Sequence, residues 1–238
     1  MSDPADQVEA TGVERSTAKG DVTVHELSRT QQTVARRVAE SKATVPDMTL
    51  GAEADLEACA QHVGAELDHV DLVVKAAALA LREVPEANAS FRDHRQERYS
   101  RINVGFSVFT DDELWVPTLH DADARPVREL AAERRELTEK VRAGTIRAPE
   151  LANATFTVVD LSELGARHGA SVVIPPQAGI LTLGAPERRA VVRGDQVVAR
   201  TVADLTLTCD HRILYGRPAA RLLARIVELL ADPPALLG

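Results

Sequence analysis

The sequence has no apolar run of about 20 residues, the length that a membrane-spanning helix requires. It also lacks an N-terminal apolar stretch of the kind that directs secretion. These two absences predict a cytoplasmic protein without a membrane partner. Aromatic residues make up only 3% of the chain, so alanine, valine and leucine must fill most of the core.

Cysteine is nearly absent, and positive charge is not clustered. Cys59 and Cys209 stand in unrelated contexts without the Cys/His spacing of a zinc site, so we expect two free thiols and no metal. The formal net charge is -8, whereas a nucleic-acid surface needs clustered lysine and arginine. The arginine pairs at 134–135 and 188–189 are typical of solvated helix or loop faces. The chain therefore predicts no nucleic-acid partner.

What is present is a globular composition with one clear boundary. Of the 238 residues, 45% are apolar, which is enough for a sizeable core. Residues 1–22 are polar and predict a flexible N-terminal tail, so the folded domain would occupy residues 23–238.

Hydrophobic periodicity predicts the elements of that domain. A helix should begin after Ser28, its expected N-cap, and end before Val45. Further helices are expected near 54–65, 68–83, 126–141 and 218–230, and strands near 48–52, 104–109, 114–119, 155–159, 179–184, 191–193 and 197–207. Strands that turn back on themselves between long helices indicate an α+β fold, with one mixed sheet covered by helices.

The stretch from Cys209 to Gly216 contains the strongest chemical signal. It places His211 at the end of a strand, before a glycine turn and an amphipathic helix. A histidine held there by charged neighbours suits a general base, because imidazole can accept and return a proton near neutral pH. The alternative is a buried or capping structural histidine, and the motif alone does not choose between the two.

Seven segments in a fixed order extend this signal along most of the chain. They are Val34–Lys42 with Val45-Pro46, Lys75–Leu81 with Val84–Ser90, Ile102–Phe106, Val116-Pro117 with Asp121–Asp123, Thr155–Val158, Ile174–Leu181 and Asp210–Arg212. In this order and at these spacings, residues 24–238 resemble the catalytic domain of the dihydrolipoyl acyltransferases of 2-oxo acid dehydrogenase complexes. That family shares its fold with chloramphenicol acetyltransferase.

The resemblance implies a fold, an assembly and a catalytic residue. The fold would be the two-layer sandwich of chloramphenicol acetyltransferase, and the assembly a homotrimer or a larger trimer-based particle with active sites between subunits. His211 aligns with the histidine that deprotonates the thiol of coenzyme A or dihydrolipoamide before this thiol attacks an acyl thioester. Acetyl-CoA would be the co-substrate. Asp210, Arg212 and Gly216 would support the site.

The sequence departs from the family pattern at two positions. Tyr215 stands where the family has an aspartate or asparagine, which in some relatives pairs with an arginine of the first helix; the matching arginine here is Arg37. Val159 stands where the family has a serine that stabilises the tetrahedral oxyanion, and losing such a donor typically costs about 10²–10³ in rate. Thr157, Ser162 or a backbone N–H are the alternatives for that donor. Tyr215 and Val159 are also explained by simple packing.

These departures leave three functions open. The first is an acetyl-CoA-dependent acyltransferase that acts on a hydroxyl of a small molecule, as in bacterial natural-product pathways of the tetronate type. The second is a dihydrolipoyl acyltransferase core that acts on a lipoyl domain in trans, because this chain carries no lipoyl group. The third is a non-catalytic oligomeric scaffold. The sequence favours the first, since His211 is retained while its usual neighbours are not.

The two ends of the chain bear on its organisation. Complex-forming relatives carry lipoyl domains before the catalytic domain, whereas only a short polar tail precedes it here; Met1 and the motif changes favour a natural stand-alone protein over a trimmed piece. In relatives with cubic or larger cores, an apolar C-terminal tail docks across a two-fold interface. Residues 234–238 would do the same or would close the last helix.

Overall fold

The computed structural model describes residues 15–110 and 113–237, and the chain divides into a first unit, Met1–Glu40, and a second, Ser41–Gly238. The first unit contains two short antiparallel strands, β1 (Arg15–Thr17) and β2 (Gly20–Val22), and most of helix α1 (Arg29–Thr44). Most of the tail expected over residues 1–22 lies outside the described residues, and its flexibility stays a prediction.

The N-cap predicted for α1 is confirmed. The backbone N–H of Gln31 donates to the Ser28 hydroxyl at 3.1 Å, and the N–H of Ser28 donates to the Gln31 side-chain oxygen at 2.9 Å. This reciprocal capping box satisfies two donors that would otherwise be free at the start of the helix. Among the described residues, no helix combines the length and the apolar composition that a bilayer crossing needs.

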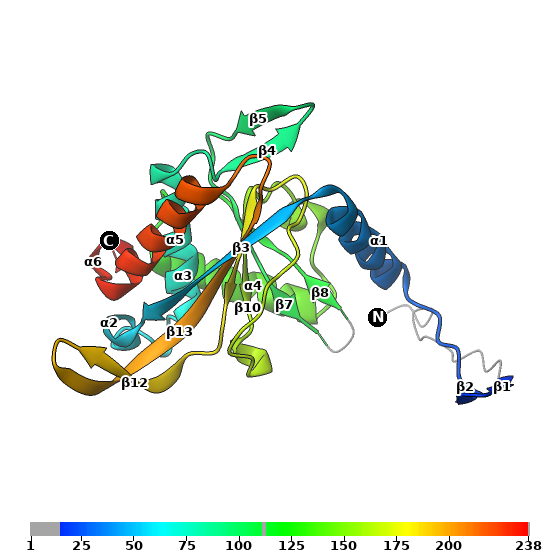
Figure 1. Cartoon of the computed structure of the whole chain (residues 1–238), viewed down its shortest axis with the longest axis horizontal. Helices are drawn as coiled ribbons and strands as arrows, with labels where there is room; N and C mark the ends of the chain where they lie inside the picture. Colours follow the sequence, from blue (N-terminus) through cyan, green and yellow to red (C-terminus); the bar gives the residue numbers. More distant parts are fainter. Residues whose placement is uncertain (1–14, 111–112, 238) are drawn as a thin grey trace. The chain divides into compact units, whose positions relative to one another are not determined.

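One mixed sheet of seven strands lies at the centre of the second unit (Figure 1). Its order is β12 (Glu187–Arg193), β13 (Gln196–Asp210), β11 (Gly179–Leu183), β10 (Phe156–Asp160), β6 (Val104–Phe106) and β9 (Thr118–Leu119), and β3 (Asp47–Asp55) also pairs with β13. β10 runs parallel to β11 and β6, whereas the other pairs are antiparallel. The predicted α+β fold with one mixed sheet is therefore confirmed.

Strand β13 positions the residues that follow it. Its first half pairs with β12, and its second half lies between β3 and β11. Near its end, Cys209 is opposite Met48 on one side and Gly179 on the other. Because a shift of one residue would turn every side chain to the opposite face, pairing on both edges fixes the register. The chain therefore leaves the sheet at a defined point, after Asp210.

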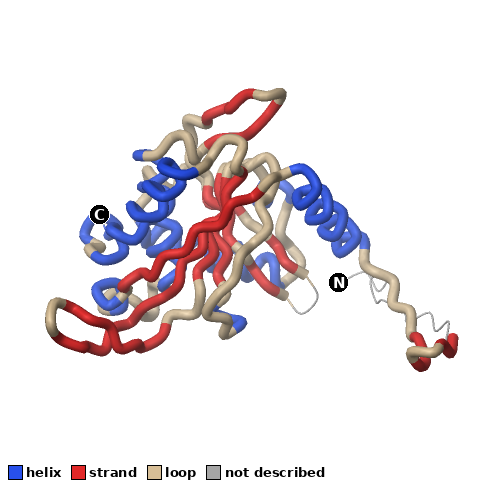
Figure 2. The backbone as a smooth tube through the Cα atoms, in the orientation of Figure 1, coloured by secondary structure: helices blue, strands red, loops and turns tan. Residues whose placement is uncertain are grey.

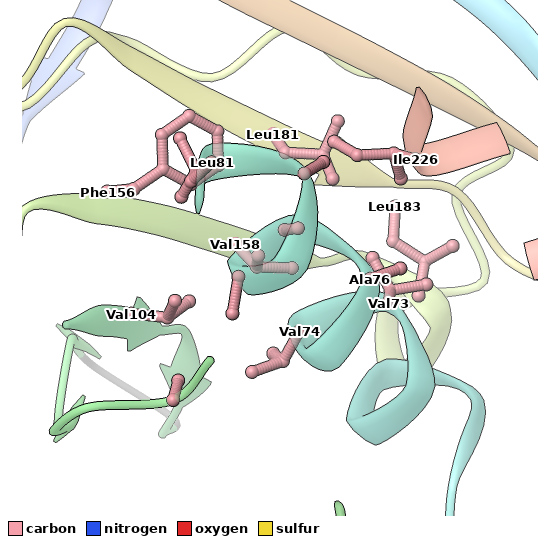
Figure 3. Close-up of a cluster of buried hydrophobic side chains, with 14 of the residues drawn as sticks. Val73, Val74, Ala76, Leu81, Val104, Phe156, Val158, Leu181, Leu183 and Ile226 are labelled. Atoms are coloured by element: carbon pink, nitrogen blue, oxygen red, sulfur yellow. The ribbon is translucent and has the colours of Figure 1, made fainter. Parts of the chain in front are cut away.

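Helices α3 (His69–Glu83) and α5 (Gly216–Ala231) pack against the sheet and enclose the main core. Figure 3 shows Leu81 of α3 and Ile226 of α5 beside Phe156 and Leu181 of the sheet. The helix expected near 68–83 corresponds to α3, and most of its residues are buried.

The smaller elements complete the second unit, and Figure 2 separates its helices, strands and loops by colour. They are α2 (Glu57–Ala60), α4 (Val127–Arg142), α6 (Pro234–Leu237), the 3-10 helices Ala148–Leu151 and Ser162–Leu164, the hairpin of β4 (Ala89–Arg92) and β5 (Arg95–Arg98), and the pair β7 (Val108–Phe109) and β8 (Leu114–Trp115). Leu236 of α6 is fully buried within its own chain, which favours the expectation that the C-terminal residues close the last helix.

The helix predicted over residues 54–65 is wrong. β3 continues to Asp55, which is opposite Val202 of β13, and only Glu57–Ala60 are helical in α2. Pairing with a long neighbouring strand outweighs local helix propensity here.

The strands expected over 104–109 and 114–119 are each broken in two. β6 and β9 stay in the central sheet, whereas their neighbours β7 and β8 leave it and pair with each other. Asp111 and Asp112, between β7 and β8, lie outside the described part of the chain.

The opposite face of the sheet carries a smaller apolar cluster. Side chains alternate along β10, so Val158 points into the main core while Val159 packs with Val45, Val173 and Ile180. Val173 belongs to the segment between the second 3-10 helix and β11. That segment is thereby held over this face of the sheet.

Gly184 lies directly against this covering segment, because a Cβ at position 184 would overlap the carbonyl oxygen of Arg167. We predict that Gly184→Ala lowers the free energy of unfolding by about 1–3 kcal/mol, since the backbone must move to make room. Urea denaturation measures this. Gly64→Ala is the matched control, because a Cβ there meets nothing within 4 Å. Equal loss of stability in both variants would contradict the role of close packing at Gly184.

Candidate active site

The chain leaves β13 through a tight turn of residues 210–215, called here the His211 turn. The carbonyl oxygen of Asp210 accepts hydrogen bonds from the backbone N–H groups of Ile213 at 3.1 Å and Leu214 at 2.9 Å. The N–H of His211 donates to the carbonyl oxygen of Pro46 at 2.9 Å, directly before β3. The backbone of His211 is therefore tied to the sheet, and the sheet sets its position.

An ion pair inside the turn fixes its shape. Asp210 is only 2% exposed, and its carboxylate accepts hydrogen bonds from Nε of Arg212 at 2.9 Å and from Nη2 at 2.6 Å. The pairing raises the pKa of Arg212, and the guanidinium also lies over the ring of Phe91, 4.2 Å from its centroid. Bidentate pairs of this kind are among the stronger side-chain interactions. Asp210 and Arg212 thus shape the turn, and their charges satisfy each other.

His211 is exposed, and its imidazole makes no hydrogen bond to any residue that the structure describes. Its aromatic neighbour is Tyr215, with ring centroids 5.9 Å apart and planes tilted by 55°. Tyr215 is 54% exposed and precedes Gly216, whose φ of 46° favours glycine and lets the chain turn into α5. An exposed imidazole without a hydrogen-bond partner among the described residues is available to accept a proton from a bound molecule.

The cysteines are excluded as nucleophiles. Both are free and buried, and burial raises the pKa of the Cys209 thiol to about 12 and that of Cys59 to about 11. Thiolates are the reactive form, so neither side chain competes with His211 for chemistry near neutral pH.

The residues expected near an oxyanion lie on β10 and just after it. Thr157 is fully buried, and its hydroxyl donates to Gln177 Oε1 at 2.8 Å, so its proton is already engaged. Val159 packs in the small apolar cluster and offers no side-chain donor. The backbone N–H of Ser162 donates to the carboxylate of Asp160 at 2.8 Å.

One chain does not bring Val159 to its own histidine. Val159 is opposite Thr182 on β11, and Thr182 is opposite Thr206 on β13, five residues before His211. At about 3.3 Å per residue, this register separates the two positions by roughly 16 Å along the strands. A site that joins both positions therefore needs a second chain.

Two residues beside the site, Gln177 and Phe91, are not predicted as site residues from the sequence. Gln177 lies in the segment Ile174–Leu181, which resembles the family, and this resemblance could have indicated it. Phe91 had no such signal, because its contact with Arg212 joins residues far apart in the chain. Arg37 is exposed on α1 in the first unit, and its role stays a prediction. No cluster of His, Cys, Asp or Glu side chains suited to a metal ion occurs in residues 15–110 and 113–237.

The profile of the family described as 2-oxoacid dehydrogenases acyltransferase (catalytic domain) matches residues 19–238. The chain belongs to this family. It is 32% identical over 231 residues to the dihydrolipoyllysine-residue acetyltransferase component of the pyruvate dehydrogenase complex of Acholeplasma laidlawii. The aligned region covers 92% of this chain and 42% of that protein. The Rhizobium meliloti (strain 1021) component is 32% identical over 221 residues, with 87% and 49% covered. The chain spans about half the length of the curated relatives it matches.

Solved structures agree with this family. The dihydrolipoamide acetyltransferase of Azotobacter vinelandii has a TM-score of 0.85 at 31% identity, covering 93% of this chain and 96% of that one. A chloramphenicol acetyltransferase has a TM-score of 0.51 at 13% identity, with 82% and 94% covered, which supports the fold alone. The predicted family and fold are therefore confirmed.

The Azotobacter vinelandii structure also bears on the two departures. It comes from an investigation of a serine, a histidine and an asparagine in that enzyme's catalytic mechanism. The serine and the asparagine stand at the same spacings from that histidine as Val159 and Tyr215 stand from His211. This family member therefore has a hydroxyl and an amide at the spacings where this chain has an apolar and an aromatic side chain.

We predict that Asp210→Asn lowers the free energy of unfolding by about 1–3 kcal/mol, because the buried partner of Arg212 loses its charge and an acceptor. Urea denaturation gives the value. Asp121→Asn is the control, since its pair with Arg101 is exposed and such pairs contribute about 0–1 kcal/mol. A smaller loss in Asp210→Asn than in Asp121→Asn would contradict the structural importance of the buried pair.

Proposed function

We propose that this chain transfers an acyl group between coenzyme A and a dihydrolipoyl thiol, with His211 as the general base. The observation that carries this function is the exposed imidazole at the end of β13, on a turn fixed by the Asp210–Arg212 pair. Family membership supports the reaction class, and the curated relatives are named for acetyl transfer to a dihydrolipoyllysine residue. Those names favour the second of the three expected functions over the first.

The chemistry requires one proton carrier. His211 accepts the proton of the attacking thiol while its sulfur forms a bond to the carbonyl carbon of acyl-CoA. The tetrahedral intermediate then expels the thiolate of coenzyme A, which takes the proton back from the imidazolium. One S–H bond and one C–S bond break, and one of each forms. Coenzyme A and acetyl-CoA are therefore co-substrates in this proposal.

A hydroxyl of a small molecule is the second candidate acceptor. Val159 and Tyr215 favour it, because they alter the surroundings in which the family's histidine works. Against it, an alcohol is far less acidic than a thiol and demands a better-oriented base. His211 has no orienting hydrogen bond within the described part of its own chain, so the thiol remains the better match.

We also propose that the active site forms between subunits of a homotrimer or a larger trimer-based assembly. Two observations support this: the roughly 16 Å between His211 and Val159 along the strands of one chain, and the imidazole without a hydrogen-bond partner among the described residues. A solved relative with a TM-score of 0.85 is the cubic core of the pyruvate dehydrogenase multienzyme complex. A neighbouring chain would then supply the groups that orient the base and stabilise the oxyanion.

We predict that His211→Ala reduces acetyl transfer from acetyl-CoA to dihydrolipoamide by at least about 10²-fold, because the proton carrier is lost. Release of coenzyme A measures the rate, with a panel of hydroxylated small molecules as parallel acceptors. His62→Ala is the control, since this histidine is also exposed but lies far along the chain. Faster transfer to a hydroxyl than to dihydrolipoamide would favour the second candidate. If wild type and His211→Ala are equally inactive on every acceptor, the result would favour the third function, a non-catalytic scaffold.

Light scattering tests the assembly. We predict a mass of at least three times the 25.7 kDa of one chain, since a single chain lacks the second half of the site. Activity should be lost on dilution at the concentration where the assembly dissociates. An active species with the mass of one chain would contradict the shared site.

A further inference from the structure

The β4–β5 hairpin is attached directly to the His211 turn. The amide of Gln96 donates to the carbonyl oxygen of Ile213 at 3.2 Å, and the ring of Phe91 lies under the guanidinium of Arg212. Ser90 also forms a β-bridge with Gln177. Figure 1 shows the hairpin standing beside the end of β13 and the start of α5. Whatever binds this hairpin is therefore held next to the exposed imidazole.

The arginines around the His211 turn differ from those elsewhere. The chain has 36 carboxylates, and within the described residues of the second unit nearly every arginine forms an ion pair. The exceptions are Arg95, Arg98, Arg135 and Arg217. Arg135 lies on α4 and donates to the carbonyl oxygen of Glu66.

The other three exceptions lie near the His211 turn. Arg95 and Arg98 are exposed on β5, and Arg217 is exposed in the first turn of α5, two residues after Tyr215. Arg98 donates only to the neutral side chain of Gln96, at 2.9 Å, and Arg95 and Arg217 have no acidic partner among the described residues. Among the described residues, positive charge without an acidic partner thus lies beside the exposed histidine of a chain whose net charge is -8.

We propose that Arg95, Arg98 and Arg217 form a docking surface for an acidic protein domain that carries the acceptor thiol. This inference rests on the proposed function, because the relatives are named for acetyl transfer to a dihydrolipoyllysine residue, which is a dihydrolipoyl group attached to a lysine of a protein. Such an acceptor arrives on a protein, which needs a surface beside His211. Unpaired arginines attract an acidic face and raise the rate of encounter.

The shape of the surface favours a protein over the phosphates of coenzyme A. Small-molecule sites are concave, whereas these arginines lie on a projecting hairpin and on the first turn of a helix. Two hollows that the described residues form lie elsewhere. One is lined by residues of α4 and the 3-10 helix Ala148–Leu151, and the other by residues of α3 and α5.

The test compares one acceptor in two forms: free dihydrolipoamide and a reduced lipoyl domain of net negative charge. In Arg95→Glu/Arg98→Glu, kcat/KM for the domain should fall by about tenfold or more, which is the range of electrostatic steering. kcat/KM for free dihydrolipoamide and KM for acetyl-CoA should stay within about twofold of wild type. Added salt should lower the wild-type rate with the domain and affect the variant less.

Two control variants separate local charge from other effects. Arg128→Glu/Arg142→Glu changes the net charge equally on α4, where both side chains are exposed, and should keep the wild-type rate with the domain. Arg95→Lys/Arg98→Lys keeps the charge and should retain most of that rate.

The outcomes separate this proposal from the function on which it rests. A hairpin variant with the wild-type kcat/KM for the domain overturns the docking surface, as does a wild type that uses free dihydrolipoamide but not the domain. A raised KM for acetyl-CoA overturns it too and assigns the arginines to the phosphates of coenzyme A. Wild-type protein that is inactive on both acceptors removes the proposed function and the docking surface together.

Discussion

The buried carboxylate of Asp210 is the constraint on which the site depends. It lies at the last position of β13, where the strand is still paired with β3, and it holds the backbone and the guanidinium of Arg212. A buried charge is costly unless it is fully paired, so this pair admits few alternative turn shapes. The turn that results leaves His211 outside the core. Stability at Asp210 and chemistry at His211 are thus linked through two consecutive residues.

In the proposed mechanism, this arrangement leaves the base incomplete within the described part of one chain. The imidazole has no orienting hydrogen bond among the described residues, and the strand register keeps Val159 roughly 16 Å away. A general base usually works with a group that orients it and a donor that stabilises the oxyanion. Supply of both by a neighbouring chain would make activity depend on assembly. Arg95, Arg98 and Arg217 beside the turn have no acidic partner among the described residues, so their positive charge is available to a partner protein.

Much of the fold could be predicted from local pattern. The helices near 68–83, 126–141 and 218–230 correspond closely to α3, α4 and α5, because each has an apolar face that packs into the main core. The helix expected over 54–65 was wrong since residues up to Asp55 pair with Val202, far along the chain. Pairings between distant strands leave little trace in local periodicity.

The site divides in the same way. Asp210, His211 and Arg212 are consecutive, so one short motif contains all three candidate residues. Phe91 and Gln177 contact site residues from other elements, and only the folded chain brings them there. Thr157 is one of three alternatives that the sequence leaves open for the oxyanion donor, and its hydroxyl donates to Gln177. Hydrogen-bond partners of buried polar groups are set by packing, which the sequence does not display.

A structure of the assembled protein with bound coenzyme A tests the central claim most directly. The prediction is that the sulfur of coenzyme A lies within hydrogen-bond reach of an imidazole nitrogen of His211, with a residue of the neighbouring subunit contacting the same imidazole. A sulfur bound away from His211, or an imidazole covered by its own chain in the assembly, would contradict the role of His211 as the acyl-transfer base.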